Sequence, residues 1–226
     1  MSNPIIVFDL DGTLVDTAPD LIATLNLVLV SESIPAVPFE TARPMIGGGV
    51  RPLIEQALAE QQRYIDDAAI DVLFERYITR YQDHIADHSR PYPGVETALD
   101  ALNAQGFTLA VCTNKFESLS VRLLDALGMT DRFAAICGQD TFPVKKPHPD
   151  MLLQTIAKAG GDPARAIMVG DSNTDVRTAR AAAVPVIGVD FGYTDIPMAK
   201  LSPDRLISDF NQLPTAVAEL LRLPAV

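Results

Sequence analysis

Two carboxylates one residue apart, Asp9 and Asp11, follow the short apolar run IIVF near the start of the chain. Polar groups of complementary chemistry follow later apolar stretches: Thr113, Asn114, Lys146, Asp171 and Asp175. A carboxylate can act as a nucleophile on phosphorus, and a second carboxyl group can give a proton to a leaving oxygen and then take one from water. Hydroxyl, amide and ammonium groups are donors that suit phosphate oxygens. These residue types together predict a site for phosphoryl chemistry.

The acids Asp9, Asp11 and Asp171 cannot gather in one place as free anions, because neighbouring like charges strongly disfavour joint ionisation. A hard cation resolves this conflict. Mg²⁺ accepts oxygen ligands from one or two carboxylates together with substrate phosphate oxygens. We therefore predict a magnesium site at these acids and a small anionic phosphorylated substrate as the partner.

The pattern of apolar residues indicates which elements position these side chains. Six short apolar runs are typical of buried strands: Ile5–Phe8, Phe107–Cys112, Ala134–Cys137, Ala166–Val169, Val184–Val189 and Arg205–Ile207. After Tyr92 they alternate with amphipathic helical patterns, two of which end at Gly106 and Gly128. This alternation predicts an α/β fold, a doubly wound, Rossmann-like parallel sheet with helices on both faces. Ligands of such sheets bind beyond the carboxyl ends of the strands, where the polar residues are expected to lie.

One part of the chain lacks this alternation. From residue 17 to about residue 90 there is no strand pattern, and helical patterns cover residues 21–31, 50–62 and 67–85. Thr17 is expected to cap the first of these helices, with Asp20 in its first turn. We predict an all-helical cap domain at residues 16–90, inserted into a core domain of residues 1–15 and 91–226. The flanking stretches LVDT and HSRPYPG are expected to act as hinges.

The composition excludes several classes of protein. The chain has 226 residues, of which 48% are hydrophobic and 21% charged, a balance typical of soluble globular proteins. Its formal net charge of -11 argues against nucleic acid or an anionic membrane as a partner. There is no apolar stretch of about 18 residues, and the first residues lack the basic region of a signal peptide, so we predict a cytoplasmic protein. Cys112 and Cys137 lie in apolar runs and are interpreted as buried reduced thiols, with a disulfide as the alternative.

Four stretches, FDLDGTLVDT, VCTNK, KKPHPD and VGDSNTD, resemble the four motifs of the haloacid dehalogenase-like hydrolase superfamily, in the same order. The helical insert is also similar to that family's helical cap. The resemblance implies that Asp9 is the nucleophile and a metal ligand. It implies that Asp11 is the general acid/base, with its backbone carbonyl on the metal. Gly12 would allow close approach of the backbone.

The same resemblance implies roles for the later motifs. Thr113 and Asn114 would bind the transferring phosphoryl group, and Lys146 would neutralise the phosphate and the nucleophile. Asp171 would complete the magnesium site. Asp175 would either support the metal shell or cap the helix that follows it, and both roles stay open.

Several reactions occur in this family, so the fold alone does not choose among them. The second acid, Asp11, favours phosphoryl transfer over dehalogenation. The phosphonate-cleaving relatives use a Schiff-base lysine in the cap, and this chain has no lysine between Asp16 and Arg90. Phosphosugar mutases carry a cap lysine as well, and a histidine near the place of Leu21. A phosphatase is the reaction that best fits the residues present.

Four further stretches are similar to bacterial phosphoglycolate phosphatases: DTAPDLIATLN, PMIGGGVRPLIEQAL, YPGVETALDAL and DSNTDVRTARAA. That resemblance implies hydrolysis of 2-phosphoglycolate to glycolate and phosphate. We expect Gly48, Gly49 and Arg51 to contact the second anionic group of the substrate from the cap, with Arg43 a weaker candidate. Sugar phosphates, nucleotides and pyrophosphate remain alternative substrates, and a non-catalytic module that binds a phosphorylated ligand remains an alternative function. The expected assembly is a monomer or a small homo-oligomer.

Overall fold

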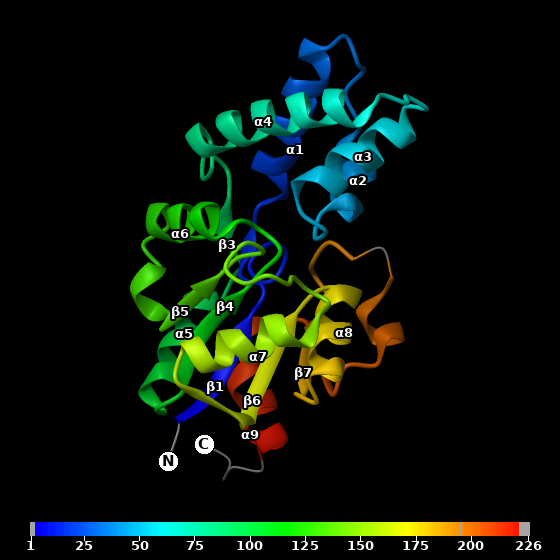
Figure 1. The fold of residues 1–226 in the computed structure, drawn as a ribbon. Helices are drawn as coiled ribbons and strands as arrows, with labels where there is room; N and C mark the ends of the chain where they lie inside the picture. Colours follow the sequence, from blue (N-terminus) through cyan, green and yellow to red (C-terminus); the bar gives the residue numbers. More distant parts are fainter. Residues whose placement is uncertain (1–2, 195, 222–226) are drawn as a thin grey trace.

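The chain folds around a parallel sheet of six strands, with a helical insert at one end (Figure 1). The computed structural model describes residues 3–194 and 196–221. The strands, in spatial order, are β5 (Ala135–Cys137), β4 (Thr108–Cys112), β1 (Asn3–Phe8), β6 (Gly161–Gly170), β7 (Val186–Val189) and β8 (Arg205–Ile207). All neighbours pair in parallel, which confirms the predicted α/β class. The main difference from the sequence prediction is β6, which begins at Gly161 rather than Ala166.

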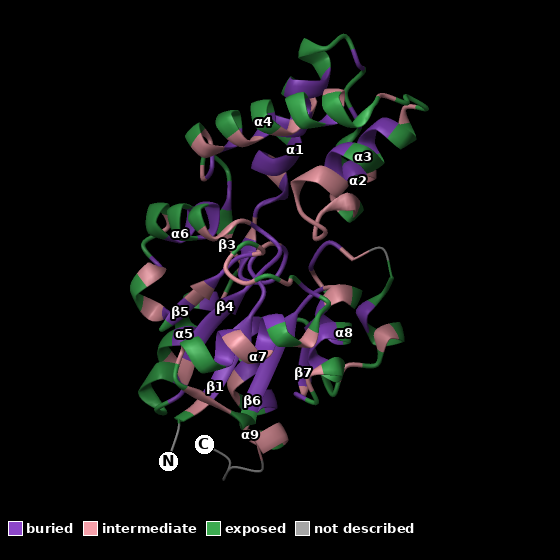
Figure 2. Cartoon of the chain, in the orientation of Figure 1, coloured by how far each residue is buried: buried purple, intermediate pink, exposed green. Residues whose placement is uncertain are grey.

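Alternate residues of β1 enter two different apolar layers, because successive side chains of a strand point to opposite faces. Ile6 and Phe8 pack in the layer formed with α5 (Val95–Ala104), α6 (Glu117–Ala126) and α9 (Leu213–Leu221). Ile5 and Val7 pack in the layer formed with α7 (Pro149–Lys158) and α8 (Asn173–Ala181). The central strands are therefore buried on both faces (Figure 2). Cys112 of β4 and Cys137 of β5 lie opposite each other in the strand register. Both are buried free thiols, as predicted.

The insert consists of helices α1 (Ala18–Ser31), α2 (Phe39–Ala42), α3 (Val50–Glu60) and α4 (Asp67–Asp83). Helix α4 packs on both α1 and α3, and their buried faces belong to the same apolar cluster as one face of the sheet. In Figure 1 the insert stands beyond the carboxyl ends of β1 and β4. Short 3-10 turns complete the described elements: Arg43–Met45, Thr130–Arg132, Met198–Leu201 and Phe210–Gln212. In the described ranges, no helix is long and apolar enough to cross a membrane.

The two chain segments that lead into and out of the insert pair with each other. Strand β2 (Val15–Asp16) lies antiparallel to β3 (Arg90–Pro91), with Val15 opposite Pro91 and Asp16 opposite Arg90. The sequence analysis predicted hinges here and no strand, because two residues are too few to show a period-2 pattern. The division into a core domain (1–15 and 91–226) and a cap domain (16–90) stays a prediction, with this ribbon at its boundary.

The start of α1 differs from the sequence prediction. The Thr17 side chain makes no capping hydrogen bond; its hydroxyl donates instead to Asp11 Oδ1 at 2.8 Å. The hydroxyl oxygen of Tyr193 accepts from the backbone N–H of Thr17 and of Ala18, at 2.6 and 2.9 Å. A side chain from beyond β7 therefore takes the place of the predicted cap. The carboxylate of Asp20 accepts from the backbone N–H groups of His88 and Ser89, so it holds the returning linker.

Candidate active site

The polar residues predicted from the sequence gather at the carboxyl ends of three neighbouring strands. Asp9 follows β1, Thr113 follows β4 and Asp171 follows β6, and the three strands are adjacent in the sheet. Strand order reverses around β1, because the chain runs from β1 to β4 and β5 on one side and then returns to β6 on the other. This is the position at which open α/β sheets bind ligands.

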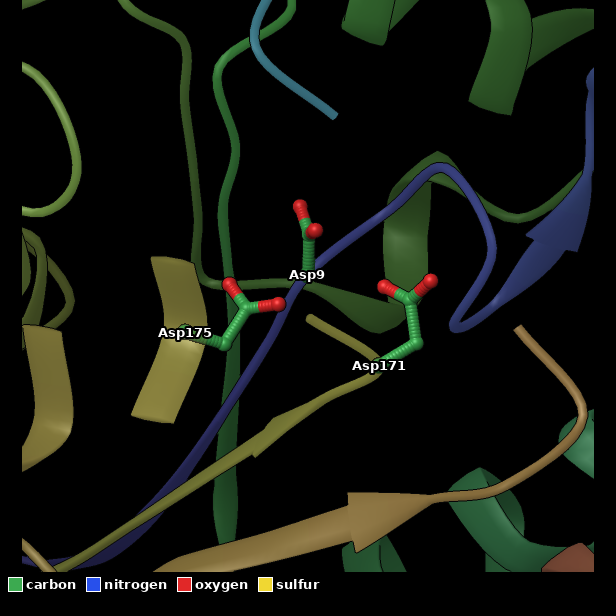
Figure 3. Close-up of side chains that lie close together, drawn as sticks. All are labelled: Asp9, Asp171 and Asp175. Carbon is green, nitrogen blue, oxygen red and sulfur yellow. The ribbon is translucent and has the colours of Figure 1, made fainter. Parts of the chain in front are cut away.

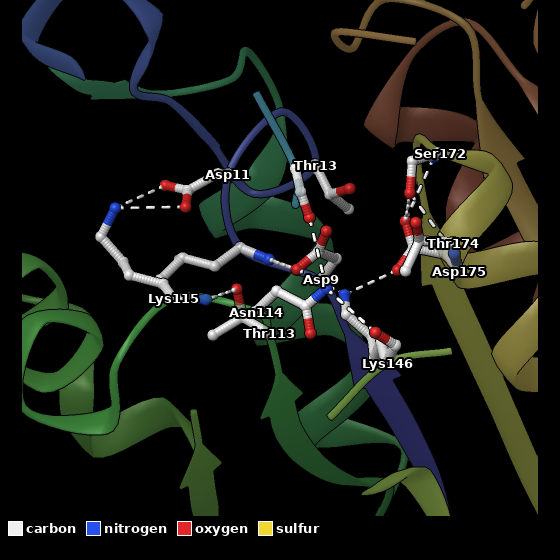
Figure 4. Close-up of polar contacts among 12 residues, drawn as sticks. Asp9, Asp11, Thr13, Thr113, Asn114, Lys115, Lys146, Ser172, Thr174 and Asp175 are labelled. Atoms are coloured by element: carbon white, nitrogen blue, oxygen red, sulfur yellow. Dashed lines mark hydrogen bonds and ion pairs between the residues drawn. The ribbon is translucent and has the colours of Figure 1, made fainter. Parts of the chain in front are cut away.

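Lys146 joins two of the acids at the centre of the site (Figure 4). Its ammonium nitrogen lies 2.8 Å from Asp9 Oδ1 and 2.6 Å from Asp175 Oδ1, and its side chain is only 1% exposed. Burial disfavours the charge, but the carboxylates of Asp175 and Asp9 outweigh that effect and raise the pKa of Lys146 above its usual value. The buried cation therefore stays charged and fixes the orientation of Asp9.

One oxygen of Asp9 is held and the other is available. Oδ1 accepts from the backbone N–H of Leu10 at 2.8 Å and pairs with Lys146. Among the described residues, Oδ2 has no hydrogen-bond or ion-pair partner, and Asp9 lines a cavity between the sheet and the insert. Burial raises the pKa of Asp9 to about 6, although Lys146 opposes this rise. At neutral pH the carboxylate is ionised, as a nucleophile must be.

Asp171 is held from two sides. Oδ1 accepts from the hydroxyl of Thr13 at 3.1 Å, and Oδ2 accepts from the backbone N–H of Tyr193 at 2.7 Å. Gly12 passes close to it with φ of +81°, and a Cβ at that position would lie 2.5 Å from Asp171 Oδ2. Only glycine fits this approach. Burial, followed by repulsion from Asp175 and Asp9, raises the pKa of Asp171 to about 8.

Carboxylate oxygens of Asp9, Asp171 and Asp175 all lie within 4.8 Å of one another (Figure 3). Burial first, and repulsion between the acids after it, raise the pKa of Asp9 and of Asp171. Among the described residues one ammonium, that of Lys146, contacts this cluster, at Asp9 and Asp175, so three acids share one positive charge and positive charge is in deficit. A hard divalent cation with oxygen ligands fits this deficit. The donor set therefore suits Mg²⁺.

The oxygens of Asp175 are already in use. Oδ2 accepts from both the backbone N–H and the hydroxyl of Ser172, at 3.1 and 2.6 Å, which closes a capping box at the start of α8. Oδ1 accepts from Lys146. Asp175 thus has three donors on its two oxygens, one of them an ammonium. Asp171 has one neutral donor on each oxygen, and Asp9 Oδ2 has none among the described residues, so Asp9 and Asp171 keep more capacity to hold a metal.

The Asp11 side chain lies apart from this cluster and has its own cation. Lys115 Nζ lies 3.0 Å from Asp11 Oδ1 and 3.1 Å from Oδ2 (Figure 4). Lys115 stands in the VCTNK stretch, and no role for it is predicted from the sequence. Its position directly after Thr113 and Asn114, at a strand end, was the only available signal.

Thr113 and Asn114 are buried and line the same cavity. Thr113 Oγ1 accepts from the backbone N–H of Lys115 at 3.2 Å. The Asn114 amide donates to the carbonyls of Lys146 and Gly47, at 3.2 and 3.3 Å, and its Oδ1 is buried without a partner in the described part of the chain. Asn114 therefore links the site to the GGG segment of the insert.

The predicted contacts from the insert divide into two groups. Gly49 lines the cavity, and a Cβ there would lie 3.2 Å from Gln139 Oε1. Gly48 and Arg51 are not among the described residues that line it.

Arg51 is partly exposed and pairs with Glu55 and Asp71 on the insert's own helices. Arg43 stacks on the Tyr193 ring, 5.2 Å from its centroid, and donates to the Phe191 carbonyl. Gly48 and Arg51 thus lie outside the described lining of the cavity, and their contact with substrate stays a prediction.

Comparison with known proteins identifies the family of this chain. Residues 6–189 match the family described as haloacid dehalogenase-like hydrolase. The chain belongs to the haloacid dehalogenase-like hydrolase family. The match spans the strands that carry Asp9, Thr113 and Asp171, so the three carboxyl ends that form the site all lie inside it.

Members of this hydrolase family resemble the chain over nearly its whole length. A phosphoglycolate phosphatase of Mesorhizobium japonicum is 51% identical over 98% of this chain and 97% of its own length. One from Agrobacterium fabrum is 50% identical over 97% of this chain and 94% of its own. A crystal structure from Haemophilus somnus, described as a predicted phosphoglycolate phosphatase, superposes with a TM-score of 0.89 at 31% identity, covering 96% and 98% of the two chains. The chain is thus an enzyme similar to phosphoric monoester hydrolases.

Proposed function

We propose that the chain is a Mg²⁺-dependent phosphatase that hydrolyses 2-phosphoglycolate to glycolate and phosphate through an aspartyl-phosphate intermediate. The observation that carries this proposal is the carboxylate of Asp9. Lys146 and the Leu10 N–H fix its Oδ1, while Oδ2 remains without a partner among the described residues, at a cavity also lined by Asp11, Thr113 and Asn114.

The proposed reaction has two steps. Asp9 Oδ2 attacks phosphorus, the bond from phosphorus to the glycolate oxygen breaks, and Asp11 gives that oxygen a proton. Water then attacks phosphorus and gives a proton to Asp11, the acyl-phosphate P–O bond breaks, and free Asp9 and phosphate result. The proton of Asp11 is therefore restored at each turnover.

Other side chains bind and neutralise the phosphoryl group. Lys146 offsets negative charge at Asp9, and the polar groups of Thr113 and Asn114 line the place where the phosphate oxygens would lie. Asp9 and Asp171 would hold Mg²⁺, with the backbone carbonyl of Asp11 as a further ligand implied by the family. When bound, Mg²⁺ supplies positive charge that neutralises the phosphate.

The insert is proposed to act as a lid over the cavity. Gly47, Gly49 and Tyr81 from the insert line it opposite the strand ends. A lid that opens and closes about the β2–β3 ribbon would admit substrate and keep bulk water away from the reacting atoms. The net charge of -11 and the free buried cysteines support a cytoplasmic enzyme without a nucleic acid partner.

A substrate panel tests the proposal. We would compare kcat/KM for 2-phosphoglycolate, a sugar phosphate, a nucleoside monophosphate, pyrophosphate and p-nitrophenyl phosphate, with Mg²⁺ and with excess chelator. The proposal expects 2-phosphoglycolate to be the best substrate and chelation to abolish turnover reversibly. A clear preference for another ester would reject the substrate, and full activity in chelator would reject the metal. Binding of the esters without hydrolysis of any would indicate a binding module.

A further inference from the structure

Two buried lysines lie near the reacting carboxylates, and they differ in access to the cavity. Lys146 lies between Asp9 and Asp175 and is not among the residues that line the cavity. Lys115 does line it, and in the described part of the chain no other cavity-lining side chain is cationic. A ligand in this cavity that carries a second negative group therefore has one cation to meet besides the phosphate-binding groups, an ammonium that Asp11 also contacts.

The position of Lys115 is set from both sides of the cavity. From the core, Asp11 holds its ammonium with contacts of 3.0 and 3.1 Å. From the insert, the aromatic ring of Tyr81 faces the same ammonium, with 4.6 Å from Nζ to the ring centroid. The Lys115 side chain is 4% exposed, so its charge is shielded from bulk water. The ring and the Asp11 carboxylate together hold the ammonium in one desolvated place.

Tyr81 carries a polar group as well as its ring. It lines the cavity, and its hydroxyl is buried without a hydrogen-bond partner among the described residues. A buried hydroxyl left unpaired is costly, and a ligand oxygen would satisfy it. The ammonium of Lys115 has three donors, so it can contact Asp11 and a ligand together.

We propose that Lys115, supported by Tyr81, binds the carboxylate of the substrate while the phosphoryl group lies at Asp9. This inference rests on the proposed function and adds the residue that distinguishes a carboxylate-bearing phosphomonoester from a neutral one. It replaces the role that the sequence suggested for Arg51, whose guanidinium pairs with Glu55 and Asp71 instead. The alternative to this proposal is a positional role, in which Lys115 orients Asp11 and does not touch the substrate.

A pair of matched esters separates the two roles. 2-Phosphoglycolate and ethylene glycol monophosphate have the same phosphate ester and the same number of carbons, but the second has a hydroxymethyl group in place of the carboxylate. We expect Lys115→Met to lower kcat/KM for 2-phosphoglycolate roughly 10- to 100-fold more than for the glycol ester, the range expected for a lost charge-assisted hydrogen bond. Lys115→Arg should restore most of the discrimination. Lys145→Met, at an exposed position outside the cavity, is the matched control and should leave both values unchanged.

The outcomes are distinct. An equal loss for both esters in Lys115→Met would overturn the proposal and show that Lys115 acts through Asp11. If the wild-type enzyme itself does not prefer 2-phosphoglycolate to the glycol ester, the proposed substrate fails first and the role of Lys115 fails with it. Turnover of the glycol ester shows that a variant is folded. If Lys115→Met does not turn over the glycol ester, the two esters would be compared with Lys115→Gln, which keeps a donor beside Asp11 without the charge.

Discussion

The ammonium nitrogen of Lys146 lies 2.8 Å from Oδ1 of Asp9, so the carboxylate proposed to attack phosphorus has a buried cation on one oxygen and, within the described ranges, none on the other. The contact has two consequences. It keeps Asp9 ionised against the effect of burial, and it fixes which oxygen is available to react. Because Asp175 holds the far side of Lys146, the three residues act as one unit.

Removing the cation from this unit should damage both stability and turnover. We expect Lys146→Met to lower the free energy of unfolding by about 3–5 kcal/mol, because it leaves the buried carboxylates of Asp9 and Asp175 without their cation. The kcat should fall at the same time, because Asp9 loses the charge that favours its ionised form. Urea unfolding and steady-state kinetics measure the two effects, with exposed Lys145→Met as the control. A Lys146→Met protein with wild-type stability would contradict the account of this unit.

The metal-free protein should become less stable as pH rises. In the folded chain the pKa values of Asp9 and Asp171 are raised from 3.8 to about 6 and about 8, so the folded state binds more protons than the unfolded state between about pH 4 and pH 8. The contribution of these two carboxyl groups to the free energy of unfolding is complete below about pH 4. It is lost as the pH rises through about 6 and then about 8. We would measure unfolding free energies in chelator at pH 5 and pH 8.

Two comparisons assign this pH effect to the site. Asp171→Asn cannot ionise, so its stability should decline less between pH 5 and pH 8 than that of the wild type. Mg²⁺ should raise the melting temperature of the wild type more at pH 8 than at pH 5, because the metal binds the ionised carboxylates. Stability that rises with pH in chelator, equally in both proteins, would show that these acids are not shifted as described.

Gly12→Ala should disturb Asp171 by direct contact. The added Cβ would lie 2.5 Å from Asp171 Oδ2, so the carboxylate must move from its hydrogen-bonded place. We expect Mg²⁺ affinity, measured by calorimetry, to fall by about 10–100-fold, as when a metal ligand loses its support. Gly106→Ala is the matched control: Gly106 has φ of +82° with nothing within 4 Å of its Cβ position, so it shares the backbone strain and lacks the clash. Equal Mg²⁺ affinity in the two variants would reject the steric argument.

Tyr193→Phe should loosen the junction between the insert and the sheet. The lost hydroxyl accepts from the N–H groups of Thr17 and Ala18 and donates to Asp16 Oδ1 at 2.7 Å, so removing it leaves buried groups without partners. The expected loss is about 1–3 kcal/mol in the free energy of unfolding. Tyr64→Phe, at a residue 93% exposed, should change it by less than about 0.5 kcal/mol. Similar values for both variants would show that Tyr193 does not secure this helix start.

The sequence was sufficient for residues that directly follow a buried strand. Asp9, Thr113 and Asp171 each come at the end of an apolar run, so a correct prediction of strands also placed them at one edge of the sheet. The parallel order followed from the alternation of strands and helices. The β2–β3 ribbon was missed, because a pairing of two residues leaves no periodic pattern.

The remaining residues depend on contacts between distant parts of the chain. Lys115 meets Asp11 and Tyr81 only after the insert has packed on the sheet. Thr17 was expected to cap α1, but Tyr193 supplies the acceptor for that helix start and leaves the threonine hydroxyl for Asp11. Arg51 has a suitable charge and a suitable place in the sequence, yet two nearby acids of the insert take its guanidinium. In each case local chemistry allowed several partners, and tertiary packing selected one.

Acid trapping would show whether Asp9 carries the phosphoryl group during turnover. Wild-type enzyme with Mg²⁺ and 2-phosphoglycolate labelled on phosphorus would be quenched in acid within the first turnover, and the labelled peptide identified by mass spectrometry. We expect covalent phosphate on Asp9, up to one per chain, and no covalent label in Asp9→Asn, whose turnover should fall roughly 10⁶-fold while its fold is kept. Phosphate on another residue, or rapid turnover by Asp9→Asn, would contradict this expectation.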